Sequence, residues 1–171
     1  STIAHLIPRF YDVTDGRITI DGQDVREVTL DSLRSQVGVV QQDTFLFKTE
    51  LRNNVAYGEP LAEQDRVEEA TGTAQLHDYV AGLPEGYGTL VGERGVSLSG
   101  GQRQRLSIAR SVLVTPRIIV FDDSTAAIDA GTELRIREAL KALNRERATV
   151  IISHRLSSLM HADEILFLED G

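Results

Sequence analysis

"RIIVFDD" (117–123), "GTELRIREALKAL" (131–143) and "ATVIISH" (148–154) follow one another along the chain. The first and third are apolar runs typical of buried strands, and the second places its apolar residues on one face of a helix. Apolar strands that alternate with helices are typical of a parallel sheet covered on both faces. This stretch therefore predicts an α/β fold with a mostly parallel sheet flanked by helices.

The same alternation continues toward both ends of the chain. "VGVVQQ" (37–42) predicts another buried strand, and "LDSLRSQ" (30–36) predicts a short helix before it. "GRITIDGQDV" (16–25) alternates apolar and polar residues and turns at an Asp-Gly pair, which favours a strand with a tight turn. The ends add two short helices and a last strand, predicted over 1–8, 155–162 and 164–171.

Residues 51–110 have a different sequence pattern. The helical stretches "EQDRVEEATGTA" (63–74) and "LHDYVAGL" (76–83) alternate there with glycine-rich connections, and no strong strand pattern appears. We therefore predict one domain over 1–171, with an α/β core formed by 1–50 and 111–171. An α-helical subdomain over 51–110 is inserted into that core.

Composition excludes several classes of protein. With 41% apolar and 26% charged residues the chain has the composition of a folded globular domain. Its net charge of −8 argues against nonspecific nucleic-acid binding, so no nucleic-acid partner is expected. It has no cysteine, which excludes disulfides and thiolate metal sites. No stretch approaches the roughly 18 apolar residues of a membrane span, so a membrane role would need a partner or a further segment.

"VSLSGGQRQRLSIARSVL" (96–113) carries the most chemical information. Ser99, Gly100 and Gly101 directly precede an amphipathic helix, whose first N–H groups can bind phosphate. Glycine lets a phosphate approach the backbone closely, and the Ser99 hydroxyl and Gln102 amide could add contacts. A plain helix cap with a solvated Gln and Arg face is the alternative.

"LSGGQRQR" (98–105) resembles the signature motif of ATP-binding-cassette (ABC) ATPases. Further stretches resemble the family's other motifs in the expected order, and together they cover the whole chain. They are the Q-loop in "VVQQDTFLF" (39–47), the exporter X-loop in "TLVGERG" (89–95), Walker B in "IIVFDD" (118–123), the D-loop in "AAID" (126–129) and the H-loop in "ISHR" (152–155). The resemblance implies a P-loop NTPase with a RecA-like core that binds ATP and Mg²⁺.

The resemblance also implies roles for single residues. Asp122 holds Mg²⁺, Gln42 contacts the metal and the attacking water, and His154 senses the γ-phosphate. Asp129 makes a dimer contact, and Glu93 lies near the contact with a membrane domain. Taken singly, each has a plainer interpretation, such as a structural histidine, a strand-end amide, a solvated acidic turn or a surface ion pair.

Asp123 departs from the family pattern. The residue there orients and deprotonates the attacking water, and the family places a glutamate at this position. Aspartate is shorter by one methylene, about 1.5 Å, and a displacement of about 1 Å in catalytic geometry can cost on the order of 100-fold in rate. Asp123 thus resembles the residue in the degenerate half of a heterodimeric exporter, although Gln42 and His154 keep the family's residue types.

The phosphate-binding P-loop, G-x-x-x-x-G-K-[ST], does not occur in the sequence. "STIAHLIPRFYD" (1–12) resembles the segment that follows its lysine, which places Ser1 at the Mg²⁺-binding hydroxyl and Thr2 at the next position. The chain therefore resembles a fragment without the P-loop strand. We expect an exposed sheet edge, very weak ATP binding and no hydrolysis by the isolated chain.

The leading hypothesis is the nucleotide-binding domain of an ABC exporter. By resemblance, it pairs with a second such domain, as a homodimer or heterodimer, and sandwiches ATP. It also joins a transmembrane domain at the cytoplasmic face of the cell (inner) membrane and hydrolyses ATP to power export. One alternative is a degenerate, non-hydrolysing half of a heterodimeric exporter. The other is a soluble ABC ATPase, which would lack the exporter-type "TLVGERG" (89–95).

Overall fold

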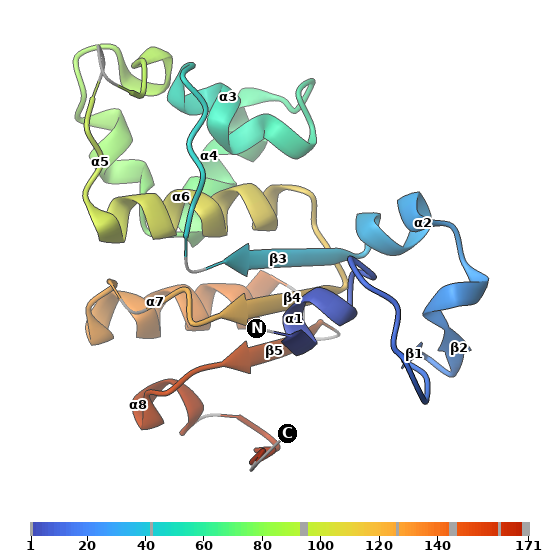
Figure 1. Ribbon diagram of the computed structural model, residues 1–171. Helices are drawn as coiled ribbons and strands as arrows, with labels where there is room; N and C mark the ends of the chain where they lie inside the picture. The colour runs from blue at the N-terminus through green and yellow to red at the C-terminus, as the bar shows by residue number, and fades with distance from the viewer. Residues whose placement is uncertain are drawn as a thin grey trace.

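The computed structural model describes residues 2–41, 43–92, 96–125, 127–143, 147–160 and 162–168. Its central feature is a parallel sheet of three strands: β3 (Val37–Gln41), β4 (Ile118–Asp122) and β5 (Ala148–Ile152). The strands lie in the order β3-β4-β5 and are in register, so that each residue of β4 faces one residue of each neighbour. The predicted α/β fold with a parallel sheet is confirmed (Figure 1).

The central strand β4 and the edge strand β5 differ in how deeply their side chains are buried. On β4, Ile119 and Phe121 pack into the larger apolar core, and Val120 packs into a second core on the opposite face. A strand covered on both faces has no reason to alternate polar with apolar residues, which accounts for its continuous apolar run. On β5, Ala148 and Thr149 are exposed, so the prediction of a buried strand is wrong there. The reason is that these two residues belong to neither apolar core of the described part of the chain, whereas Val150, Ile151 and Ile152 pack against the cores.

One face of the sheet carries α1 (Thr2–Leu6), α2 (Leu30–Ser35) and a hairpin. The hairpin consists of β1 (Thr19–Ile20) and β2 (Gln23–Asp24), an antiparallel pair joined at the predicted Asp-Gly turn. A 3-10 turn, η1 (Val25–Glu27), follows, capped by the Asp24 side chain. This side supplies the smaller core of Ala4, Val25, Leu33, Val37 and Val120.

The other face carries two long helices, α6 (Gly100–Leu113) and α7 (Ala130–Leu143). α6 packs against β3 with one side and against α4 with another. The remaining helices lie beyond α6, on its side away from the sheet (Figure 1). They are α3 (Leu51–Val55), η2 (Ala56–Gly58), α4 (Gln64–Thr73), α5 (His77–Ala81) and η3 (Gly86–Gly88).

The predicted boundary between residues 110 and 111 falls inside α6, which is one continuous helix. Leu106 and Ile108 of α6 are fully buried in the larger core, which also contains Val67 of α4 and Val40 of β3. Because one helix contributes to both sides of the predicted boundary, the helices and the sheet share a core. The division into 51–110 and a surrounding core stays a prediction.

Asn54 fixes the segment between β3 and α3, although its polar side chain is 0% exposed. Its Oδ1 accepts from the Phe47 N–H at 3.0 Å and from Arg110 at 3.2 Å. Its Nδ2 donates to the carbonyls of Phe47 at 3.0 Å and Glu50 at 3.2 Å. All the hydrogen-bonding capacity of the amide is thereby used within the protein.

We expect Asn54→Ala to lower the free energy of unfolding by about 3 kcal/mol, because it leaves buried backbone groups without partners at a cost of roughly 1–3 kcal/mol each. The neighbouring Asn53 is exposed, and among the described residues its side chain bonds only to the Thr49 hydroxyl, at 3.3 Å. Asn53→Ala is therefore the matched control, with an expected loss below about 0.5 kcal/mol. Denaturant unfolding measures both, and equal losses would contradict the assignment.

The last predicted strand is wrong over its described part. After α8 (Leu156–Leu159), residues 164–168 form no strand and no helix. Their apolar side chains are exposed, with Phe167 at 87%. The physical reason is that a strand needs a neighbour for its backbone groups, and no described strand pairs with this segment. None of the described helices is long and apolar enough to cross a membrane.

Candidate functional site

The three strands of the sheet end together at one edge. Gln41 faces Asp122 across one ladder, and Asp122 faces Ile152 across the other. The residues that follow these strand ends therefore lie at the same edge, including the predicted Asp123 and His154 (Figure 1). Asp122 is buried at 7% exposure, Asp123 is half-buried, and His154 is exposed. Gln42, the third predicted catalytic residue, lies outside the described residues.

Asp122 and Asp123 have different backbone conformations. Asp122 ends β4, whereas Asp123 has a φ of 46°, in the left-handed region. The Asp123 N–H donates to the Ile152 carbonyl at 2.8 Å, which holds this turn against the end of β5. Left-handed backbone costs a non-glycine residue roughly 1–2 kcal/mol, and such residues cluster at functional sites. The geometry is compatible with separate roles for the two carboxylates.

The donor set at this edge fits Mg²⁺ better than a metal held mainly by protein. Among the described residues there is no group of three His, Cys, Asp or Glu side chains that could hold a metal ion. Mg²⁺ bound together with nucleotide normally takes one or two carboxylates, with phosphates and water filling the other positions. Asp122 is a single buried carboxylate of this kind. Ser1, the predicted hydroxyl ligand, lies outside the described residues, and Thr2 is exposed at the start of α1.

The predicted phosphate-binding segment forms the N-terminus of α6. Ser99 is the N-cap: its Oγ accepts from the Gln102 N–H at 3.2 Å, and Gln102 Oε1 accepts from the Ser99 N–H at 2.7 Å. This capping box is the plain helix cap that the sequence predicts as the alternative to a phosphate site. It still leaves the Ser99 hydroxyl hydrogen and the Gln102 amide NH₂ able to donate to a ligand. The helix has 14 residues, enough for its dipole to favour an anion at this end.

Gly100 and Gly101 also meet a second segment of the same chain. A Cβ on Gly100 would lie 3.4 Å from the Cβ of Ala127, and a Cβ on Gly101 would lie 2.8 Å from the Ala127 carbonyl oxygen. The start of α6 therefore packs on the loop after β4. The sequence argument gave these glycines a role toward phosphate, and the contact with Ala127 is an additional reason for their small size.

Asp129 ends the loop after β4 and is exposed. Its Oδ1 accepts from the Thr132 N–H at 2.9 Å, so it caps the first turn of α7. Hydrogen bonding from the Thr132 backbone and side chain lowers the pKa of this carboxyl group. The structure thus gives Asp129 a local role, and its predicted dimer contact stays a prediction.

The chain that follows the predicted Q-loop lies beside the start of the predicted X-loop. The Leu51 N–H donates to the Thr89 carbonyl at 2.9 Å, and the Val91 N–H donates to the Thr49 carbonyl at 3.0 Å. These bonds join the chain that follows the predicted Q-loop to the start of "TLVGERG" (89–95). Glu93 itself lies outside the described residues.

An aromatic patch adjoins these segments, formed by Phe45, Phe47 and Tyr57. Phe47 stacks on Tyr57 with 4.3 Å between ring centroids and meets Phe45 edge-on at 5.0 Å. The Arg110 guanidinium lies 5.3 Å from the Phe47 ring, and burial lowers its pKa. Phe45 and Tyr57 are mostly exposed. Exposed aromatic side chains beside a held arginine are typical of protein interfaces.

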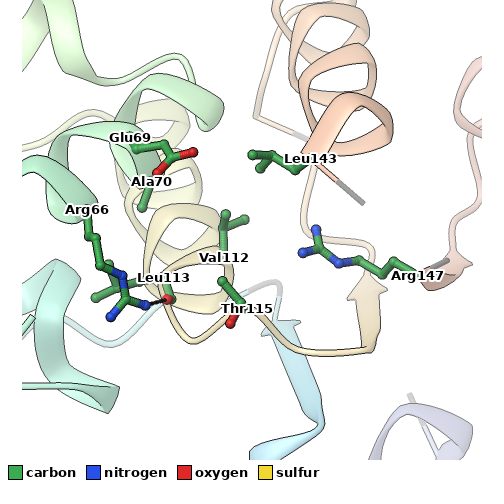
Figure 2. Close-up of a pocket in the computed structure, with 8 residues that line it drawn as sticks. All are labelled: Arg66, Glu69, Ala70, Val112, Leu113, Thr115, Leu143 and Arg147. Atoms are coloured by element: carbon green, nitrogen blue, oxygen red, sulfur yellow. Dashed lines mark hydrogen bonds between the residues drawn. The ribbon is translucent and has the colours of Figure 1, made fainter. Parts of the chain in front are cut away.

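A hollow of about 140 Å³ lies at the opposite end of the strands. Figure 2 shows its lining, from Arg66 on α4, Leu113 at the end of α6, Leu143 at the end of α7 and Arg147 before β5. None of the predicted site residues borders it. The hollow is therefore separate from the candidate site at the sheet edge.

Sequence reasoning named neither Gln104 nor Arg155 as a site residue. Gln104 Oε1 accepts from the Ala127 N–H at 3.0 Å, and the Arg155 guanidinium donates to the Thr125 carbonyl at 3.0 Å. Both lie inside stretches already quoted for their motifs. Their bonds join residues 23 and 30 positions apart, and no local pattern reports such contacts.

The geometry can be compared with known proteins. A sequence model of the family described as ABC transporter matches residues 1–126. A Staphylococcus aureus (strain NCTC 8325) protein, named as a multidrug export ATP-binding/permease protein, is 50% identical over all 171 residues. The Bacillus subtilis (strain 168) protein YgaD, with the same name, is also 50% identical over 171 residues. The chain spans about 30% of the length of these relatives.

A solved structure, of a bacterial Atm1-family ABC exporter with ATP bound, has a similar fold. It matches 95% of this chain with a TM-score of 0.89 and 46% sequence identity. The matched part is 28% of that chain.

Proposed function

Because the chain belongs to the ABC transporter family, whose members bind ATP with Mg²⁺ and hydrolyse it, we propose that it is part of the nucleotide-binding domain of an exporter. The observation that carries the proposal is that β3, β4 and β5 end at the same edge of the sheet. There Asp122, Asp123 and His154 follow adjacent parallel strands, and the same loop that begins at Asp123 reaches the "SGGQ" helix start. Ligands of open α/β sheets bind at this carboxyl edge.

Each residue at the edge has a proposed task. Mg²⁺, when bound with ATP, neutralises charge on the β and γ phosphates. Asp122 holds that ion from the end of β4. Asp123 accepts the proton of the attacking water, and His154, exposed at the end of the next strand, donates to the γ-phosphate. As the family resemblance implies, Gln42 would contact the metal and the water, and Ser1 would supply a hydroxyl to the metal.

The helix start at Ser99–Gln102 contacts the nucleotide that a second nucleotide-binding domain holds. Its Ser99 hydroxyl, Gln102 NH₂ and first N–H groups face phosphate oxygens held by a second nucleotide-binding domain, whether identical or different. A 14-residue helix favours negative charge at this end. Asp129 and the loop before it contribute to the contact between the two domains. Thr2 contacts phosphate on the chain's own side.

We propose that the aromatic patch of Phe45, Phe47 and Tyr57, together with Glu93, contacts the transmembrane domain at the cytoplasmic face of the membrane. Two bonds join residues 49–51, which lie between Phe47 and Tyr57, to residues 89–91 and support one continuous surface. The exposed rings of Phe45 and Tyr57 supply apolar area that water solvates poorly. A soluble ABC ATPase has no such partner for this surface.

The second candidate is a degenerate half of a heterodimeric exporter. Asp123 favours it, because a shorter side chain stands where the family pattern has glutamate. In that case the helix start at Ser99 serves the partner's competent nucleotide, and the site at Asp122 hydrolyses slowly. Binding of the transported molecule would involve parts of the relatives that this chain does not span.

We expect the purified 171-residue chain to release no phosphate from Mg²⁺–ATP above background. Its sequence has no G-x-x-x-x-G-K-[ST] string, and the glycines and lysine of that string cradle the phosphates. An exporter that carries this chain together with such a string is the positive control and should hydrolyse ATP. Turnover by the 171-residue chain alone would contradict the prediction, and an inactive exporter would contradict the proposed function.

A further inference from the structure

The loop after β4, described at residues 123–125 and 127–129, is held from the side of α6. Gln104 lies in the second turn of α6 and is 6% exposed. Its Oε1 accepts from the Ala127 N–H at 3.0 Å. Next to it, Gly101 approaches the Ala127 carbonyl so closely that a Cβ would lie 2.8 Å from the oxygen. The N–H and the carbonyl of Ala127, which belong to successive peptide units, are therefore both in contact with α6.

The same loop is held from the side of β5. The guanidinium of Arg155, which directly follows His154, donates to the Thr125 carbonyl at 3.0 Å. The same nitrogen lies 3.8 Å from a carboxylate oxygen of Glu133. Glu133 is 7% exposed, and its other oxygen accepts from Arg137 at 2.9 Å. A buried carboxylate between two guanidinium groups thus fixes the direction of the Arg155 side chain.

The loop supplies little of its own support. Within it, the Ile128 N–H donates to the Thr125 carbonyl at 3.0 Å, and Asp123 donates outward to the Ile152 carbonyl. The two side chains from outside therefore act on the two middle peptide units. Asp123 stands at one end of the loop and Asp129 at the other, so the middle of the loop connects the two carboxylates.

We propose that Gln104 and Arg155 are positioning residues that clamp the loop Asp123–Asp129 between the start of α6 and the end of β5. The inference rests on the proposed function. Under it, the start of α6 contacts the nucleotide of a second domain, and Asp123 accepts the proton of the water that attacks the chain's own nucleotide. Gln104 then ties the signature helix to the hydrolytic carboxylate of the same chain. Neither side chain touches the nucleotide, so their loss lowers kcat and leaves the KM for ATP unchanged.

The test compares variants in an exporter that contains this chain. Gln104→Met removes the acceptor at nearly constant volume, and Gln104→Glu keeps an oxygen for the Ala127 N–H. Arg155→Met removes the donor, and Arg155→Lys keeps a charged one. We expect about a 10-fold lower kcat for each Met variant, because a shift below 1 Å costs less than the roughly 100-fold of a full ångström. The Glu and Lys variants should recover part of the loss.

Gln64→Met is the matched control, since Gln64 is partly buried at the start of α4 and its side chain bonds, within the described part of the chain, only to Glu68, at 2.9 Å. It should leave kcat and KM within twofold of the parent. The double variant Gln104→Met with Arg155→Met should lose less than the product of the single losses, because both residues hold one loop. Met variants with a kcat within twofold of an active parent would overturn the proposal, as would strictly multiplicative effects.

Amide hydrogen exchange on the chain supplies a readout that needs no activity. The Ala127 amide should exchange at least 10-fold faster in Gln104→Met and at the parent rate in Gln64→Met. The same exchange rate in Gln104→Met and the parent would overturn the clamp whatever the ATPase result. If the parent exporter hydrolyses no ATP but the Ala127 amide responds as expected, the proposed function fails and the clamp stands. Gln104→Glu, with an acceptor retained, covers the case in which Gln104→Met does not fold.

Discussion

Asp123→Glu is expected to raise the ATP turnover of an exporter that contains this chain, by as much as about 100-fold. The added methylene moves the carboxylate roughly 1.5 Å farther from the backbone, to the reach of the glutamate in the family pattern. The backbone that carries it is held in place, since the Asp123 N–H donates to the Ile152 carbonyl at 2.8 Å. The extra length therefore extends the side chain and leaves the turn where it is.

The same substitution should cost some stability. Asp123 has a φ of 46°, and aspartate tolerates the left-handed region better than glutamate does. We expect the free energy of unfolding to fall by less than about 1 kcal/mol while the rate rises. Such opposite changes in rate and stability would set Asp123 apart from a position where the residue affects folding alone.

Asp31→Glu is the matched control for the added methylene. Asp31 is exposed in the first turn of α2, remote in sequence from the strand edge. Its replacement should change neither turnover nor stability. Phosphate release from Mg²⁺–ATP measures the rate in parent and variants. A turnover of Asp123→Glu no higher than that of the parent would mean that reach at this position does not limit hydrolysis, and the degenerate-half hypothesis would lose its main support.

Local patterns predicted the parts of the fold that local physics determines. The continuous apolar run of β4 follows from burial on both faces, and the Asp-Gly turn between β1 and β2 follows from the backbone freedom of glycine. Ser99 as a helix cap also follows from its own sequence neighbourhood. Each of these features leaves a signal within a few neighbouring positions of the sequence.

Features that depend on distant partners were missed. The pattern of 164–168 is that of a strand, yet a strand forms only beside another, and the described part of the sheet offers none to this segment. β5 has the apolar composition of a buried strand, but Ala148 and Thr149 belong to neither apolar core of the described residues. The Gln104 to Ala127 bond joins two motifs that the sequence treats separately. Strand pairing and long-range contacts decide these cases, and the periodicity of apolar residues along the sequence indicates neither.

The glycines of "SGGQ" illustrate how one residue can satisfy two demands. Close approach of phosphate requires a small residue at the start of α6, and so does close approach of Ala127 from the same chain. Binding data alone would not separate the two demands, because either explains a loss on substitution. A stability measurement without nucleotide separates them, since only the contact with Ala127 is present then.

Gly101→Ala is expected to destabilise the protein by about 1–3 kcal/mol without nucleotide and to lower ATP turnover on the order of 100-fold. A Cβ at this position would lie 2.8 Å from the Ala127 carbonyl oxygen, closer than packed atoms allow, so α6 or the loop must shift. A shift of that loop strains the segment between Asp123 and Asp129, which stand at its ends. The contact partner is backbone and cannot rotate away as a side chain can.

Gly72→Ala is the matched control, because Gly72 also lies in a helix, α4, and a Cβ there would meet nothing within 4 Å. Alanine in a helix is favoured over glycine by roughly 0.5–1 kcal/mol, so this variant should be neutral or more stable. Urea unfolding without nucleotide and phosphate release with Mg²⁺–ATP measure the pair. Equal stability of Gly101→Ala and Gly72→Ala, with turnover lost only in the first, would assign Gly101 to the nucleotide alone and remove the contact with Ala127 from the account.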